Sequence, residues 1–130
     1  MGVYLAVAAG GALGSVARFW LTGAMAALTG PRFPWGTLLI NMLGSFVIGL
    51  VAGITLTPAR MGMHPDVRIF LMIGICGGFT TFSAFSLQTL ELAHEHRWSA
   101  AGANILLSVA LSLAAVWLGH WCGGALRGRS

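Results

Sequence analysis

Charge is scarce in this sequence. Only 8% of its 130 residues are charged, whereas soluble domains usually carry about 25%. Lysine is absent, and the arginines are accompanied by one aspartate and two glutamates. Hydrophobic residues make up 57% of the chain, which is more than so short a soluble domain can bury. These proportions exclude a soluble enzyme, a disordered tail and a free-standing nucleic-acid module, and they predict an integral membrane protein.

Clusters of catalytic or metal-binding residues are also missing. The sequence has no nucleophile–base pair, no phosphate-binding loop and no residues with metal-ligand spacing. Its two cysteines, Cys76 and Cys122, lie inside apolar stretches and are interpreted as packing residues. The arginines are scattered singly between apolar runs, which is typical of membrane flanks. We therefore expect neither an enzyme nor a nucleic-acid partner.

Four apolar runs divide the chain. Each can cross about 30 Å of hydrocarbon as a helix, because a helix pairs its own backbone groups. Turn residues such as Gly30-Pro31 and His64-Pro65 separate the runs. The sequence thus predicts an all-α integral membrane fold in contact with lipid. It forms a single transmembrane domain over residues 1–130, with spans at about 3–28, 34–57, 68–92 and 98–123.

The arginines do not select an orientation in the membrane. With four spans, both termini and the second loop lie on one side, and the other two loops lie opposite. The first side carries Arg60, Arg68, Arg127 and Arg129, and the second carries Arg32 and Arg97, with Arg18 if it faces that way. This near balance leaves the positive-inside rule without effect. Either other features set the topology weakly, or the chain inserts both ways and pairs as an antiparallel dual-topology dimer.

Small residues are spaced for close helix packing. Gly10 and Gly14, Gly49 and Gly53, and Gly119 and Gly123 each form a Gly-x-x-x-Gly motif. This spacing lets two helix backbones approach each other closely in a membrane. We expect these glycines to pack spans within one chain and also between two copies, because four short helices are thin for a transport path.

The third run holds the strongest local motif. Gly77-Gly78 followed by Thr80-Thr81 predicts a helix that stops and restarts in mid-membrane, with a threonine capping the second half. Lipid cannot pair the carbonyl and amide groups that such a break frees, so they must face protein, water or an ion. Carbonyls from two copies would suit a small hard cation such as sodium. The alternative is a packed kink that binds no ion.

Three phenylalanines, Phe79, Phe82 and Phe85, recur every three residues along the same run. One interpretation is that they are packing residues. The other is that their weakly positive ring edges hold a small anion. An anion held in this way is bound weakly enough to be released, which conduction requires.

Polar side chains also lie within two other runs. Asn41 follows Thr37 by about one helical turn, and its amide either joins helices or turns its N–H groups toward an anion. Asn104, Ser108 and Ser112 recur every four residues and therefore share one helix face. This polar stripe either lines a wet path or bonds to its own helix backbone.

One charge, Arg18, lies inside an apolar run. It either reaches the membrane interface or sits in a vestibule where it attracts anions. No carboxylate lies at the centre of a span, although a proton-coupled exporter of cations normally needs one there. The four histidines lie in loops or near span ends, so no proton relay is evident.

Taken together, these motifs resemble the Fluc (CrcB) family of fluoride channels. The resemblance covers essentially the whole chain, and its most specific element is Gly-Gly-x-Thr-Thr-Phe-Ser-x-Phe in the third run. The matching residues are Gly10, Gly14 and Arg18, then Gly36, Thr37, Asn41 and Gly44, and then Gly77 to Phe85. Two positions depart from the family, because Gln88 stands where glutamate is frequent and Asn104 where tyrosine can occur.

The resemblance implies an antiparallel homodimer with two fluoride pores and a central, structural sodium ion. By position, the backbone carbonyls of Gly77 and Thr80 would bind the sodium, and Phe82 and Phe85 would be the ring-edge ligands of fluoride. The resemblance also implies that Asn41 is a pore amide, that Ser108 and Ser112 continue a polar track and that Arg18 lies near the vestibule. Thr37, which shares a face with Asn41, and Asn104, which shares one with Ser108, are predicted to belong to the same fluoride pore.

We therefore expect a passive, highly selective fluoride channel in a microbial cell (inner) membrane, where it exports fluoride to reduce its toxicity. A small dual-topology multidrug exporter is the alternative, and the missing carboxylate in the first run disfavours it. A structural subunit without transport would leave the polar stripe and the predicted break without a role.

Overall fold

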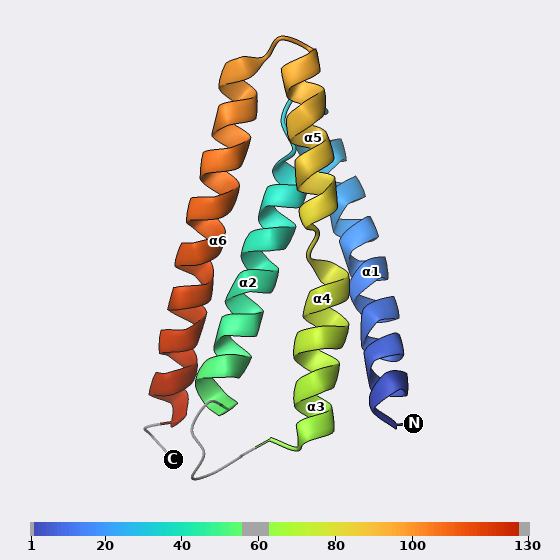
Figure 1. Cartoon of the computed structure of the whole chain (residues 1–130), viewed down its shortest axis with the longest axis vertical. Helices are drawn as coiled ribbons and strands as arrows, with labels where there is room; N and C mark the ends of the chain where they lie inside the picture. The colour runs from blue at the N-terminus through green and yellow to red at the C-terminus, as the bar shows by residue number, and fades with distance from the viewer. Residues whose placement is uncertain (1, 56–62, 128–130) are drawn as a thin grey trace.

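The computed structural model describes residues 2–55 and 63–127, and all of its regular elements are helical (Figure 1). The first two elements are the long helices α1 (Gly2–Thr29) and α2 (Trp35–Thr55). The third run forms four consecutive segments, and a long helix closes the chain. These are α3 (Pro65–Ile69), the π-helical η1 (Phe70–Cys76), α4 (Gly77–Phe79), α5 (Phe82–His94) and α6 (Trp98–Arg127).

Four helical stretches are long and apolar enough to cross a membrane: Gly2–Thr29, Trp35–Thr55, Pro65–His94 and Trp98–Leu126. We call Pro65–His94 the third span. The predicted all-α architecture with four potential spans is confirmed. Residues 56 and 57 at the end of the second predicted span lie outside the described residues, as do Arg60 and Arg129 from the charge balance.

The outer surface of the bundle is apolar. Phe19 is 84% exposed, Trp20 71% and Trp117 70%, whereas Ile40 is fully buried. A surface of this kind suits hydrocarbon, since lipid tails solvate apolar side chains as well as other apolar side chains do. The few buried positions include Asn104, which at 1% exposure is as enclosed as the core aliphatic residues.

The helices pack in two pairs, α2 with α6 and α1 with the third span (Figure 1). In the first pair the predicted glycine motifs face each other, because a Cβ atom on Gly123 would lie 3.0 Å from the Cα of Gly53. In the second pair a Cβ on Gly10 would lie 2.9 Å from the Cα of Gly74. Only glycine permits these approaches, so the motifs pack spans within one chain, as expected.

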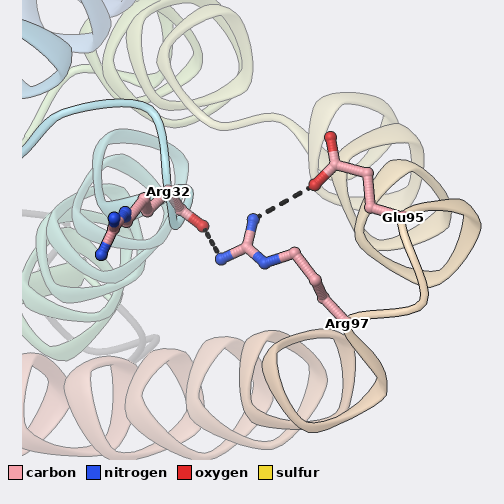
Figure 2. A network of polar contacts seen from close by, with 3 residues as sticks. All are labelled: Arg32, Glu95 and Arg97. Atoms are coloured by element: carbon pink, nitrogen blue, oxygen red, sulfur yellow. Dashed lines mark hydrogen bonds and ion pairs between the residues drawn. The ribbon is translucent and has the colours of Figure 1, made fainter.

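Two loops meet at one end of the bundle. Helix α1 is followed by Gly30, whose φ of +73° is the left-handed conformation that glycine adopts without strain. The Arg97 guanidinium donates to the backbone carbonyl of Arg32 in the first loop and, at 3.2 Å, to Glu95 in the third (Figure 2). Arg97 thereby ties the α1–α2 loop to the α5–α6 loop.

The third span is interrupted between α4 and α5. Thr80 (φ −79°, ψ 156°) and Thr81 (φ −152°, ψ 112°) have extended backbones, and the helix resumes at Phe82. Gly77 keeps helical angles of −64° and −39°, so within the Gly-Gly-x-Thr-Thr motif the extended residues are the two threonines. Gly78 serves packing, since a Cβ there would lie 2.9 Å from the Cα of Gly11 on α1.

Candidate functional site

Threonine side chains finish both helix ends at the interruption. Thr81 caps α5, because its hydroxyl accepts the backbone N–H of Ala84 at 3.2 Å. Thr80 closes the preceding segment, donating its backbone N–H (2.9 Å) and its hydroxyl (2.8 Å) to the carbonyl of Cys76. The sequence allowed either threonine to act as the cap, and the structure assigns that role to Thr81.

The side chain of Asn41 on α2 pairs with the backbone of Thr81. Its Nδ2 donates to the Thr81 carbonyl at 3.1 Å, and its Oδ1 accepts the Thr81 N–H at 2.7 Å. The amide thus takes the place of a neighbouring peptide group, which gives two buried backbone groups the partners that lipid cannot supply. Asn41 therefore joins helices, and only one of its two Nδ2 hydrogens is available to an anion.

These hydrogen bonds leave two carbonyl oxygens free. In a continuous helix, Gly77 would accept from the N–H of Thr81 and Thr80 from that of Ala84. Here Thr81 donates to Asn41 instead, and Ala84 donates to the Thr81 hydroxyl. Among the described residues, no hydrogen bond reaches the carbonyl oxygen of Gly77 or of Thr80. The interruption therefore offers two unpaired hard acceptors.

A cavity of about 440 Å³ adjoins the interruption, between α2, the third span and α6. We call it the central pocket. Its apolar walls include Ile48, Met72, Val109 and Leu113. Its other lining residues include most of the predicted site, namely Asn41, Gly77, Thr80, Phe82, Phe85, Ser108 and Ser112, together with Ser45 and Thr81.

Two of the three phenylalanines lie together at this pocket. The ring centroids of Phe82 and Phe85 are 5.2 Å apart with planes tilted by 49°. Phe85 is buried at 8% exposure, whereas Phe82 is 76% exposed at the open side of the pocket. Phe79 ends α4 and is not among the lining residues. The interruption of the helix therefore breaks the expected three-residue stripe after its first member.

The polar stripe on α6 divides between the pocket and the protein interior. Ser108 and Ser112 line the pocket, whereas Asn104 is buried behind it. Ser108 donates to Asn104 Oδ1 at 3.3 Å, and Asn104 Nδ2 donates to the hydroxyl of Thr89 on α5 at 2.8 Å. Asn104 therefore meets the central pocket through Ser108.

Two predicted residues lie elsewhere. Thr37 is buried at 4% exposure and lines a second cavity of about 220 Å³ at the loop end, together with Gln88. The Gln88 Oε1 atom is buried there without a hydrogen-bond partner among the described residues. Arg18 is half-buried on α1, where its carbonyl accepts from Thr22, and it lines neither cavity.

Sequence reasoning missed Thr89. It lies four residues after Phe85, on the same face of α5, and its hydroxyl contacts both the Phe85 carbonyl and Asn104. That register was visible in the sequence as a Phe-x-x-x-Thr spacing. The partner on α6 was not visible, because a contact between residues fifteen positions apart depends on how two helices cross.

The chemistry of the central pocket is that of neutral donors. Hydroxyls, an amide and aromatic rings line it, and no carboxylate or histidine is among its lining residues. Among the described residues, no group of three or more His, Cys, Asp or Glu side chains gathers anywhere. The fold and the pocket define a multi-pass membrane protein built to pass or hold a small solute.

Comparison with known proteins identifies the family. A family model described as "CrcB-like protein, Camphor Resistance (CrcB)" matches residues 5–120, and the chain belongs to this family. A fluoride-specific ion channel FluC of Rhodospirillum rubrum is 56% identical over 117 residues, covering 90% of this chain and 91% of the relative. The FluC of Methylocella silvestris is 55% identical over 117 residues (90% and 89%), and that of Opitutus terrae 53% over 120 (92% and 91%).

These relatives confirm the resemblance drawn from the motifs. They carry the name of a channel, and the family is one of channels and not of enzymes, as the sequence predicted. The match over residues 5–120 reaches all four potential spans and includes the interruption in the third.

Replacing Asn41 by leucine should destabilise the protein. Asn41→Leu retains the volume but leaves the N–H and carbonyl of the buried Thr81 without partners, which we expect to cost about 2 kcal/mol or more. Thermal unfolding in detergent measures the loss, with Met42→Leu on the neighbouring position as the control. Equal melting temperatures for the two variants would show that the Asn41–Thr81 pair does not stabilise the interruption.

Proposed function

We propose that this protein is a passive, highly selective fluoride channel that exports fluoride across a microbial cell (inner) membrane and so reduces its toxicity. The observation that carries the proposal is the central pocket. It brings the Asn41 amide, the Ser108 and Ser112 hydroxyls and the rings of Phe82 and Phe85 to one cavity beside an interrupted helix. The names of the relatives, which are fluoride-specific channels, support the same assignment.

Fluoride places a particular demand on such a pocket. The ion is small and strongly hydrated, so its water must be replaced by other donors before it enters a region of low dielectric constant. Neutral hydroxyl and amide donors and the positive ring edges of phenylalanine can supply this replacement. Because none of them carries a full charge, the ion is also released, which is the condition for conduction.

The multidrug exporter is the weaker candidate. A proton-coupled exporter of cations needs a carboxylate within the membrane, and no carboxylate lines the central pocket. The polar lining of this cavity of about 440 Å³ consists of hydroxyl and amide groups beside phenyl rings, and none of its lining residues carries a negative charge that could pair with a cationic drug. The family and its relatives also favour a channel.

Phe85→Ile should slow fluoride efflux. The substitution keeps an apolar side chain of similar burial but removes the ring edge, so we expect at least about a tenfold lower rate. Purified protein in liposomes, with fluoride and chloride efflux followed by ion electrodes in the absence of a proton gradient, gives the measurement.

Phe19→Ile on the outer face of α1 is the matched control, because Phe19 is 84% exposed and lies away from the pocket. It should leave fluoride efflux unchanged. Normal efflux through Phe85→Ile would exclude its ring from the path. Chloride efflux as fast as fluoride efflux through the unmodified protein would overturn the proposed selectivity.

The proposal extends to an antiparallel, dual-topology homodimer. The central pocket is open on the side where Phe82 is 76% exposed, and its hydroxyls and free carbonyls would face lipid in a single chain. A second copy would close that side. The near balance of arginines between the two ends of the bundle supports insertion in both orientations.

Both orientations should therefore be present in one membrane. Single-cysteine tags at the N-terminus and in the α5–α6 loop, placed in a variant with Cys76 and Cys122 replaced by serine, should each react partly with an impermeant maleimide from outside intact cells. Full reaction of one tag and none of the other would demonstrate a single orientation and exclude the antiparallel dimer.

A structural sodium ion completes the proposed assembly. The unpaired carbonyl oxygens of Gly77 and Thr80 fit a hard cation, because no hydrogen bond from the described residues occupies them. One chain offers too few oxygens for a cation, so the proposal requires the same two carbonyls from the partner copy. The positive charge would offset part of the cost of bringing anions into the membrane.

Removing sodium should weaken the dimer. Protein purified in N-methylglucamine chloride should dissociate to monomers at a detergent dilution at which protein in sodium chloride remains dimeric, as judged by size-exclusion chromatography with light scattering. Thr81→Val, which removes the cap and returns the Ala84 N–H to the Thr80 carbonyl, should reduce the difference between the two salts. Identical dissociation in both salts for the unmodified protein would exclude the ion.

Three residues are assigned to the path outside the central pocket. Thr37 lines the loop-end cavity and Asn104 bonds to Ser108, and we assign both to the proposed path from the pocket toward the loops. The half-buried Arg18 on α1 is assigned to a vestibule, where its charge raises the local concentration of anions.

A further inference from the structure

Three consecutive hydrogen bonds join α5 to α6 beside the central pocket. The Thr89 hydroxyl donates to the Phe85 carbonyl at 2.8 Å, Asn104 Nδ2 donates to the Thr89 hydroxyl at 2.8 Å, and Ser108 donates to Asn104 Oδ1 at 3.3 Å. Asn104 is only 1% exposed, and Ser108 is the member of the three that lines the pocket.

The donor and acceptor in each of these three hydrogen bonds follow from the bond between the Thr89 hydroxyl and the Phe85 carbonyl. A hydroxyl has a single hydrogen, and that of Thr89 is directed at the Phe85 carbonyl, so Thr89 can only accept from Asn104. The Asn104 amide must then turn its Nδ2 to Thr89 and its Oδ1 to α6. Ser108 consequently faces an acceptor and donates its hydrogen to it.

Ser108 differs in this respect from comparable hydroxyls of the described residues. Six other hydroxyls donate to the backbone carbonyl of the residue four positions earlier, at 2.7 to 2.9 Å. They belong to Thr22, Thr29, Thr55, Thr80, Ser86 and Thr89. Ser108 also bonds four residues back, but it donates to a side chain at the longer distance of 3.3 Å. A bond of that length is weaker than those at 2.8 Å.

We propose that Thr89 is a positioning residue that, by clamping Asn104, holds the Ser108 hydroxyl off its own helix backbone as a weakly bonded donor for the anion in the central pocket. The inference rests on the proposed fluoride channel and adds to it a residue that never touches the ion. Without the clamp, Ser108 is expected to donate to the backbone carbonyl of residue 104 and to bond there as firmly as the other hydroxyls do.

Thr89→Val tests the clamp, because valine keeps the shape of threonine and removes the hydroxyl. We expect the fluoride concentration that half-saturates efflux from liposomes to rise about fivefold, the factor that one ordinary hydrogen bond corresponds to. Thr89→Ser retains the hydroxyl and should restore the original value.

Thr55→Val is the matched control. Thr55 is buried and its hydroxyl makes the same bond four residues back, at 2.7 Å to the Val51 carbonyl, but no asparagine accepts or donates at it. This variant should leave the half-saturating concentration unchanged, because it removes a comparable bond from a helix end outside the pore.

A double-mutant cycle separates positioning from a merely structural role. In the Ser108→Ala background, Thr89→Val should change the half-saturating concentration by less than about twofold, since the group through which Thr89 acts is gone. An equal rise with and without Ser108, or no rise in either, would overturn the inference. Absence of fluoride efflux from the unmodified protein would instead overturn the proposed function, and the inference with it.

The side-chain amides give a readout that does not depend on transport. The chain has two asparagines, so a sample labelled with ¹⁵N-asparagine gives only two side-chain amide pairs in an NMR spectrum. Fluoride should shift the Asn104 pair in the unmodified protein and not in Ser108→Ala. An Asn104 pair that fluoride leaves unshifted would contradict the release of the Ser108 hydrogen to the anion.

Discussion

The geometry of the third span depends on the pairing of Asn41 with the backbone of Thr81. An interrupted helix exposes amide and carbonyl groups, and hydrocarbon offers them no partner. Asn41 satisfies two of these groups with one side chain, and the Thr81 hydroxyl satisfies a third at Ala84. Because these donors are diverted from their usual acceptors, no described residue donates to the carbonyls of Gly77 and Thr80. The Asn41–Thr81 pairing therefore stabilises the interruption and diverts the usual donor of the Gly77 carbonyl, while the Thr81 cap diverts that of the Thr80 carbonyl.

Close packing of glycine-bearing helices fixes the walls around this interruption. The approach of Gly53 to Gly123 sets the distance between α2 and α6, and the contact of Gly10 with Gly74 holds α1 against the third span. Helix association in lipid draws little from the hydrophobic effect, so such contacts and buried hydrogen bonds must supply it. Backbone contact thus sets the spacing of the α2 and α6 walls of the pocket, and the third span is packed against α1 in the same way.

The buried polar side chains of the described residues are all neutral. Asn104, enclosed almost completely, bonds to hydroxyls on two helices, and Asn41 bonds to the backbone of Thr81 at the interruption of the third span. A carboxylate or an ammonium group in these positions would be costly to bury and would either repel an anion or hold it too firmly. Hydroxyls and amides avoid both problems, since each can donate or accept a hydrogen bond and its hydrogen carries only a partial positive charge toward an anion. The scarcity of charged side chains in the interior agrees with their scarcity in the whole sequence, of which they make up 8%.

Periodicity and composition were sufficient to predict the all-α fold and its four potential spans. Each of those features is local, since it follows from which residues recur along one helix. Other features required the packed structure. The role of Gly78 against α1, the pairing of Asn41 with Thr81 and the clamp from Thr89 through Asn104 all join segments that are distant in sequence. Such contacts depend on how helices cross and on which donors are already engaged, and a single helical period contains no information on either.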